Sequence, residues 1–170
     1  VDADDEPDEW AVALRTAPTD GASARTARGV SGSGVEASKA MAQQDLDLVI
    51  KHADRFVSAG NRTAVLPAIL AAIASRESRC GRVLDSNGEG DHGMAFGIMQ
   101  VDKRFHNVEG RPDPHSVAHI EQAAAIFNDN LATLQKKFPD WRKGYLLKAA
   151  AAAYNFGVSN VRTKEGIDKG

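Results

Sequence analysis

Residues 66–81 read "LPAILAAIASRESRCG", an apolar run that ends in a cluster of charged residues. Pro67 suits the first turn of a helix and Gly81 suits its end, so the sequence predicts a helix that runs to about Arg79. Three apolar residues mark one face of this helix: Leu66, Leu70 and Ile73. A further step of four residues along that face reaches Glu77, so a carboxyl group continues the apolar face.

The position of Glu77 predicts an unusual pKa for its carboxyl group. Removal from water disfavours the charged form of an acid, so an acid on an apolar face keeps its proton to higher pH. Such an acid can donate a proton near neutral pH, as cleavage of a glycosidic bond requires at the leaving oxygen. Alternatively, Glu77 pairs with one of three nearby arginines: Arg76, Arg79 and Arg82. The spacing alone leaves both interpretations open.

The glycine-rich residues 86–102, "SNGEGDHGMAFGIMQVD", supply further carboxylates: Glu89, Asp91 and Asp102. Hydrolysis of a glycosidic bond commonly uses a second carboxylate, which acts as a nucleophile or holds the attacking water. Three glycines here have the G-x-G-x-x-G spacing of a dinucleotide-binding turn: Gly88, Gly90 and Gly93. That turn opens a helix, whereas the strand-like run "AFGIMQV" follows here, and acids inside the loop would repel phosphate. The stretch therefore predicts a carboxylate-bearing loop and not a nucleotide site.

Composition indicates one compact domain of 170 residues, of which 42% are hydrophobic and 26% charged. The longest apolar run, residues 64–75, is shorter than the roughly 20 residues of a membrane-spanning helix. The first ten residues hold six acids and no Lys or Arg, so we expect residues 1–20 to be an acidic, loosely ordered arm. The remaining chain is mildly basic, which suits an anionic polymer but falls short of a nucleic-acid binder.

Helical periodicity predicts a mostly helical domain over residues 21–170. The predicted helices are residues 33–60, 67–79, 114–138 and 143–154. The first begins with Ser33 and Glu36 at capping-box spacing and ends at Gly60. Its apolar face comprises Ala42, Leu46, Val49, Ala53 and Phe56. Residues 83–108 read instead as turns around short strands, so the fold class is α+β, predominantly α.

The sequence gives only weak support for two other candidate sites, a metal site and a reactive cysteine. His115 and His119 stand four residues apart, a spacing compatible with a metal ion, but no third ligand follows at a recognisable spacing. Cys80 is the only cysteine and lacks an evident histidine partner, so we interpret it as a free thiol. No metal, cofactor or disulfide is therefore expected.

Four segments, taken together, resemble the goose-type (g-type) lysozyme family in their order and spacing. They read "ASRESRCGRVL", "GDHGMAFGIMQVDKRFH", "LQKKFPDW" and "LKAAAAAYNFGVSNVRT", and the resemblance extends from about Gly21 to the end. It implies a lysozyme-like fold with a helical core and a small irregular β segment beside an active-site cleft. The fragments "ES", "GIMQ" and "AYN" also resemble the bacterial soluble lytic transglycosylases, so the reaction is open at this point.

The resemblance implies an antibacterial muramidase that hydrolyses the β-1,4 bond between N-acetylmuramic acid and N-acetylglucosamine, with inversion and without a cofactor. Glu77 matches the general acid, while Asp91 and Asp102 match the aspartates that position the attacking water. His106, Tyr154 and Asn155 match family residues that line the sugar cleft. The implied partners are peptidoglycan, chitin-like oligosaccharides and protein inhibitors of lysozymes. We expect a monomer that binds neither nucleic acid nor membrane.

Several positions depart from the family pattern. Bird members carry two disulfides, whereas matching positions here hold residues such as Ala24, Ser33 and Ala64. Glu89 stands where the family often has an aromatic residue, and the sequence stops short of the final family helix. A secreted enzyme is expected, while the absence of a leader and of disulfides leaves a cytoplasmic or lysosomal location open. The alternative functions are a lytic transglycosylase that forms 1,6-anhydro products and a non-catalytic peptidoglycan-binding module.

Overall fold

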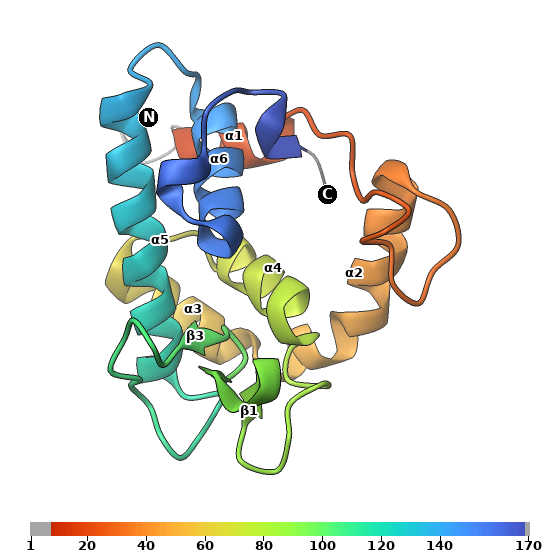
Figure 1. The fold of residues 1–170 in the computed structure, drawn as a ribbon, viewed down its shortest axis with the longest axis vertical. Helices are drawn as coiled ribbons and strands as arrows, with labels where there is room; N and C mark the ends of the chain where they lie inside the picture. The colour runs from red at the N-terminus through yellow and green to blue at the C-terminus, as the bar shows by residue number, and fades with distance from the viewer. Residues whose placement is uncertain (1–7, 169–170) are drawn as a thin grey trace, which may run out of the picture.

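The computed structural model describes residues 8–168 as a helical body with one small sheet (Figure 1). The helices are α1 (Glu9–Thr16), α2 (Gly34–Lys51), α3 (Ala53–Thr63), α4 (Pro67–Ser78), α5 (Val117–Lys137) and α6 (Lys143–Phe156). The antiparallel sheet has the order β1 (Glu89–Gly90), β2 (Ala95–Phe96), β3 (Val101–Asp102). The expected fold class, α+β and predominantly α, is confirmed.

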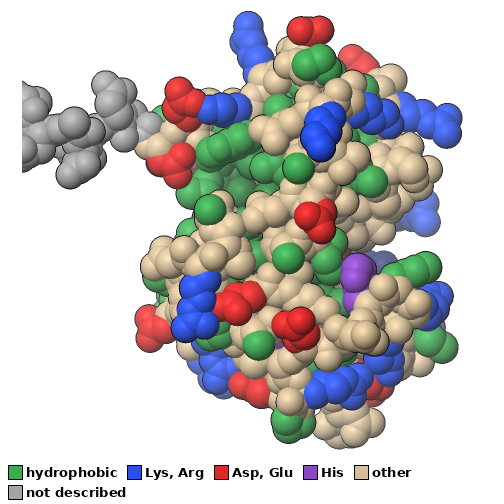
Figure 2. Space-filling view, turned by 90° about the vertical axis from the view of Figure 1, so that its left-hand side faces the viewer, with side chains coloured by type: hydrophobic (Ala, Val, Ile, Leu, Met, Phe, Trp, Pro, Cys, Tyr) green, Lys and Arg blue, Asp and Glu red, His purple; other side chains and the backbone are tan. Residues whose placement is uncertain are grey.

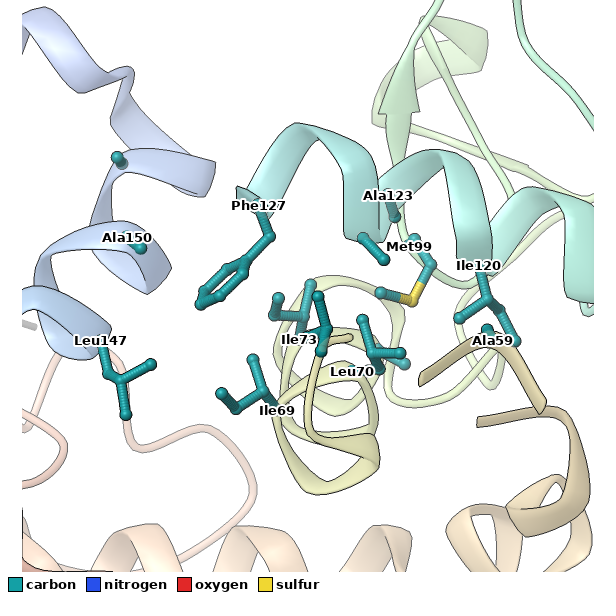
Figure 3. Packing of buried hydrophobic residues seen from close by; sticks show 14 of the residues in the cluster. Ala59, Ile69, Leu70, Ile73, Met99, Ile120, Ala123, Phe127, Leu147 and Ala150 are labelled. Carbon is teal, nitrogen blue, oxygen red and sulfur yellow. The ribbon is translucent and has the colours of Figure 1, made fainter. Parts of the chain in front are cut away.

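Helix α4 lies at the centre of the fold, and its apolar residues form much of the core. Leu70 is fully buried, and Ile73 is nearly so. Figure 3 shows both in one cluster with Phe127 of α5 and Leu147 of α6, and Met99 from the loop between β2 and β3 belongs to the same cluster. Burial of these side chains is the main stabilising contribution. The α4 face predicted from the sequence is therefore a core face.

Helices α5 and α6 confirm the predictions for residues 114–138 and 143–154. The Ser116 side chain caps α5 by accepting a hydrogen bond from the His119 amide, and α5 ends before Phe138. Three of its apolar residues are buried in the core: Ile120, Phe127 and Leu134. Gly157 follows α6 with a positive φ of 87° and ends that helix.

The single helix predicted for residues 33–60 is instead two helices. The chain bends at His52, between α2 and α3, and α3 continues through Gly60 to Thr63. Ser33 is the N-cap residue of α2, but its side chain makes no capping hydrogen bond. Ala64, in the left-handed conformation with φ 54°, ends the second helix.

The predicted apolar face of α2 is wrong at Ala42 and Leu46, both of which are exposed. Asp45 points inward in their place and is buried. Its carboxylate accepts hydrogen bonds from Ser75 at 2.8 Å and from the Arg79 guanidinium at 2.8 Å. A buried ion pair to α4 therefore fixes the orientation of α2, which hydrophobic periodicity could not reveal.

The strand-like run "AFGIMQV" folds into a hairpin and not a single strand. Residues 95–96 form β2, residues 101–102 form β3, and the turn between them includes Gly97 at φ 73° and Gln100 at φ 49°. Gly88 precedes β1 with φ 72°, and Gly93 precedes β2 with φ 81°. These glycines make the tight turns of a small sheet, a role that requires positive φ. No long helix follows them as a phosphate-binding turn would require.

The expected loose arm over residues 1–20 differs from the structure where the structure describes it. Residues 9–16 form α1, which packs against α6 through Trp10 and Leu14. Lys143 pairs with Glu9 and lies over the Trp10 ring. Residues 1–7, the most acidic part of the expected arm, lie outside the described residues. Within residues 8–168, no helix is both long and apolar enough to span a membrane.

Candidate active site

Glu77 occupies the last turn of α4, at the end of the buried face. Its side chain is half-buried, and desolvation raises the pKa of the carboxyl group above its ordinary value. The Asn155 side chain, which donates to the carboxylate, and the Arg76 charge oppose this shift less strongly. Glu77 therefore has the environment of an acid that holds its proton to higher pH than a solvated glutamate.

Two of the three arginines considered as partners of Glu77 pair with other acids. Arg79 binds Asp45 at 2.8 Å, and Arg82 binds Asp47 at 3.0 Å. Arg79 also adopts the left-handed conformation that ends α4, which turns the chain away after Ser78. Arg76 acts on Glu77 as a nearby charge. The ion-pair interpretation of Glu77 is thus wrong for Arg79 and Arg82.

Helix α6 brings Tyr154 and Asn155 to the same place. The Tyr154 hydroxyl donates a hydrogen bond to the Met99 carbonyl oxygen at 2.8 Å. Burial and the nearby Glu77 charge raise the pKa of the Tyr154 phenol, so Tyr154 stays neutral across the physiological range. Glu77, Tyr154 and Asn155 line one cavity of about 440 Å³ between α4 and α6. The sequence-predicted acid and two predicted cleft residues therefore meet in the structure.

The other predicted carboxylates lie on and beside the sheet and do not line that cavity. Asp102, in β3, accepts three hydrogen bonds from the Arg104 side chain, the shortest 2.6 Å long, and one from its backbone amide at 2.8 Å. These bonds lower the pKa of the Asp102 carboxyl group to about 2. Asp102 is therefore a firmly ionised, fully engaged carboxylate.

Asp91 is the less restrained of the two aspartates. Its side chain is 60% exposed, with the Arg104 Nη2 atom 4.0 Å and the His92 Nδ1 atom 3.7 Å from its oxygens. Asp91 and His92 adopt left-handed backbone conformations, with φ of 48° and 55°. Arg104 thus lies within ion-pair distance of both aspartates, a role that the sequence reasoning missed. A basic residue two positions after Asp102 was the available signal.

His106 is exposed in the turn after β3, where its backbone amide donates to the Asp102 carbonyl oxygen at 3.1 Å. This turn keeps His106 close in space to Asp102. Glu89, the third carboxylate of the loop, is bound at 2.8 Å by both Lys103 and Arg111. These two hydrogen bonds lower the pKa of Glu89, so it is unsuited to hold a proton.

The main chain between β2 and β3 connects the two groups of residues. Ser78, the neighbour of Glu77, donates to the Ile98 carbonyl oxygen at 2.8 Å, and Tyr154 binds the next carbonyl, that of Met99. Asp102 follows three residues later in β3. The segment that ends at Asp102 is thus anchored beside Glu77 at one end.

The two candidate metal ligands have different partners. The His115 ring stacks on His52 with 4.4 Å between centroids, whereas His119 is buried and accepts from the Met99 amide at 3.2 Å. In the part of the chain that the structure describes, no group of three His, Cys, Asp or Glu side chains could hold a metal. Burial raises the pKa of the Cys80 thiol to about 12, so this buried cysteine is unreactive.

Charges on the surface alternate in sign. Figure 2 shows acidic and basic side chains interspersed over one face, with hydrophobic side chains between them. Ion pairs that lie at least partly on the surface include Lys39–Glu36, Arg55–Asp113, Arg62–Glu121, Arg82–Asp47, Lys103–Glu89 and Arg111–Glu89. On the face shown, the basic surface is therefore not the dense single-sign stripe typical of a nucleic-acid interface.

Comparison with known proteins gives a consistent family. A family model described as "Lysozyme g" matches residues 13–170. "Lysozyme g" of Gallus gallus is 44% identical over 154 residues, which cover 89% of this chain and 72% of that protein. "Lysozyme G" of Dromaius novaehollandiae is 40% identical, with 89% and 74% covered. "Lysozyme g" of Cyprinus carpio is 41% identical, with 88% and 80% covered.

Proposed function

The chain belongs to the lysozyme g family, and from this premise we propose that it is an inverting muramidase with Glu77 as its general acid. Membership makes the protein a glycoside hydrolase, a lysozyme that acts on bacterial peptidoglycan. The assignment of individual residues and the stereochemical course are our proposal. The single observation that carries it is the desolvated carboxyl group of Glu77 beside Asn155.

In the proposed reaction, protonated Glu77 donates its proton to the oxygen that leaves the N-acetylmuramic acid unit. The raised pKa supports this role, because a general acid must be protonated at the working pH and still give up its proton in the transition state. The Asn155 side chain orients the carboxyl group and stabilises the carboxylate that forms. The apolar residues of α4 behind Glu77 limit its access to bulk water.

The attacking water needs a base on the opposite face of the sugar ring, and we propose Asp91 for that role. Asp102 is a poor base, because four hydrogen bonds from Arg104 lower its pKa to about 2. The Asp91 side chain, in contrast, is 60% exposed. Asp102 then serves as the anchor of Arg104, whose guanidinium lies 4.0 Å from the Asp91 carboxylate.

The contacts of the proposed sugar-binding residues determine which part of each side chain can bind the sugar. The hydroxyl of Tyr154 is already bound to Met99, so its ring is the part that faces substrate. The exposed His106 imidazole offers a donor and an acceptor to sugar hydroxyl or acetamido groups. Chitin-like oligosaccharides, which share the acetamido groups of peptidoglycan, are expected to bind the same cleft.

Location and assembly follow from the proposed substrate. An antibacterial enzyme meets bacterial cell walls outside the cells of its own organism. We therefore propose that the enzyme is extracellular, and we also propose that it is a monomer. Protein inhibitors of lysozymes would bind over the cleft that contains Glu77. Gel filtration with and without oligosaccharide tests whether the protein is a monomer.

The test of the function is mass spectrometry of the products released from purified peptidoglycan by the wild type and by Glu77→Gln. Reducing-end muramic acid products from the wild type, lost in the folded variant, support the proposal. Products with 1,6-anhydro ends would identify a lytic transglycosylase instead. Binding to walls without any product would identify a non-catalytic module.

A further inference from the structure

His119 is a fully buried, titratable residue that the proposed reaction does not use. It lies in the first turn of α5, with its Nε2 atom 3.2 Å from the Met99 amide nitrogen. The amide donates, so Nε2 is the acceptor, and a neutral imidazole then carries its proton on Nδ1. The Nδ1 atom is buried without a hydrogen-bond partner. A buried polar atom without a hydrogen-bond partner lowers the stability of the folded protein. The tautomer that accepts at Nε2 therefore carries a cost in stability at Nδ1.

The surroundings of His119 are shaped to admit the imidazole. Gly97 has φ 73°, and a Cβ atom built on it would lie only 2.2 Å from the His119 Nε2 atom. The Phe96 ring meets the imidazole edge-on, with 5.3 Å between centroids. Glycine at position 97 is thus required both by the backbone conformation and by the close approach of the ring.

The Met99 peptide is held from two opposite elements. The His119 side chain of α5 binds its amide, and the Tyr154 hydroxyl of α6 binds its carbonyl oxygen at 2.8 Å. One residue earlier, Ser78 of α4 binds the Ile98 carbonyl oxygen at 2.8 Å. Three helices therefore fix two successive residues of the segment that leads to Asp102.

We infer that His119 is a positioning residue, which fixes the Met99 peptide so that the strand bearing Asp102 and its partner Arg104 keeps its distance from Glu77. The inference rests on the proposed function, because the distance matters only if both sides of the cleft take part in the reaction. An error of about 1 Å in such a constellation costs on the order of 10²-fold in rate.

The groups that face His119 keep it neutral at physiological pH. Burial lowers its pKa to about 4, and the positive form of His115 adds to this effect. The Asp113 carboxylate opposes it, and Ser116 contributes its hydroxyl to the backbone amide of His119. From the loop, the Met99 amide donates to the His119 Nε2 atom. The acceptor at Nε2 is therefore available throughout the pH range in which a lysozyme with a raised Glu77 pKa would work.

The test compares His119→Gln with His119→Leu in the full chain. Glutamine can place an amide oxygen near the position of Nε2, whereas leucine fills the space without an acceptor. We expect His119→Leu to lower kcat on peptidoglycan about 10²-fold with KM changed less than about threefold, and His119→Gln to recover kcat to within about tenfold of wild type. Equal losses in two folded variants, or full activity of His119→Leu, would overturn the inference.

Two further measurements separate positioning from mere structural support. The wild type labelled with ¹⁵N should show the Nδ1–H tautomer of His119 near neutral pH, and the opposite tautomer would contradict the inference even if His119→Leu does not fold. The double variant with Tyr154→Phe should lose less than the product of the two single losses, because both side chains act on one peptide. Strictly multiplicative losses would argue for independent effects.

Amide hydrogen exchange at Met99 gives a readout that does not depend on catalysis. Exchange should be faster in His119→Leu than in His119→Gln or wild type. If Glu77→Gln retains full activity, the proposed function fails, yet this exchange measurement still decides whether His119 holds the Met99 peptide.

Discussion

The Arg104 guanidinium binds both oxygens of the Asp102 carboxylate, with Nη2 2.6 Å from Oδ2 and Nε 3.0 Å from Oδ1. The same Nη2 atom lies 4.0 Å from Asp91. A bidentate pair of this kind has a defined geometry as well as a favourable charge interaction. Arg104 therefore couples the two aspartates, and its removal is expected to change both.

Substitution of Arg104 tests that coupling. In Arg104→Gln, the pKa of Asp102 should rise from about 2 toward its ordinary value, because the side-chain hydrogen bonds that contribute most to lowering it are lost. We expect kcat to fall about tenfold, since Asp91 loses its neighbouring cation. Lys103→Gln is the matched control, because Lys103 binds Glu89 instead. Carboxyl titration by NMR and hydrolysis of peptidoglycan provide the two measurements, and equal effects of both substitutions would contradict the assigned role.

The choice between the two aspartates as base is tested by Asp91→Asn and Asp102→Asn. If Asp91 accepts the proton from water, its amide variant should lose about 10²-fold or more in kcat with the fold intact. Asp102→Asn should lose less, because an amide oxygen can still accept a hydrogen bond from Arg104. Azide should restore turnover of Asp91→Asn by replacing the nucleophile. The reverse ranking of the two variants would assign the base to Asp102.

The pH dependence of kcat reports the proton of Glu77. As the pH rises through the raised pKa of Glu77, the general acid is lost, so activity should decline on the alkaline side. The interaction with Asn155 lowers that pKa, so Asn155→Ala should raise it and move the alkaline limb to higher pH even as the rate falls. Arg76→Gln should shift the limb in the same direction by less. A shift to lower pH in either variant would show that the limb belongs to another group.

Stability should fall in mild acid because of His52. Burial, followed by the positive charges of His115, Arg55 and Lys51, lowers its pKa to about 4, below the ordinary value of 6.5. The unfolded chain therefore binds the proton first, and the stabilising contribution of neutral His52 is complete above about pH 6.5 and is lost as the pH falls toward 4.

The measurement for this prediction is the urea midpoint at pH 7 and at pH 4.5. His52→Phe keeps a ring against His115 and removes the titration, so its midpoint should drop less between the two values than that of the wild type. His92→Gln is the control, because the His92 side chain is 97% exposed. A wild-type midpoint that does not change with pH would refute the prediction.

The core role of α4 is tested by Leu70→Ala. Leu70 is fully buried, so this substitution should lower the free energy of unfolding by about 2–5 kcal/mol through lost burial and a new cavity. Leu46→Ala is the matched control on α2, where leucine is 41% exposed, and should change stability by less than about 1 kcal/mol. Similar losses in both would mean that α2 packs through the face predicted from the sequence.

Hydrophobic spacing was sufficient to predict α4, α5 and α6, because each buries one continuous apolar face. It was insufficient for α2, where Asp45 takes an inward position and pairs with Arg79. The sequence does not distinguish a buried aspartate from an exposed one. Only the contact with a partner distant in sequence reveals that the carboxylate is buried. The same limit applies to "AFGIMQV", a mostly apolar run that is typical of a strand although positive φ at Gly97 and Gln100 folds it into a hairpin.

The candidate site divides in the same way. The burial of Glu77 followed from its position on the α4 face, and the resemblance to a family supplied Tyr154 and Asn155, which line the same cavity. The roles of Arg104 and His119 depend on contacts made through the folded chain. Arg104 acts over two residues in sequence, but His119 lies twenty residues beyond Met99, a separation that no local pattern connects.

The left-handed backbone at Asp91 and His92 has a consequence for protein engineering. Non-glycine residues in this conformation each cost roughly 1–2 kcal/mol, so the loop is a natural target for substitutions that raise heat resistance. His92→Gly should be such a substitution. Glycine would also widen the range of positions open to the Asp91 carboxylate. We therefore expect His92→Gly to be more stable to heat and to have a lower kcat.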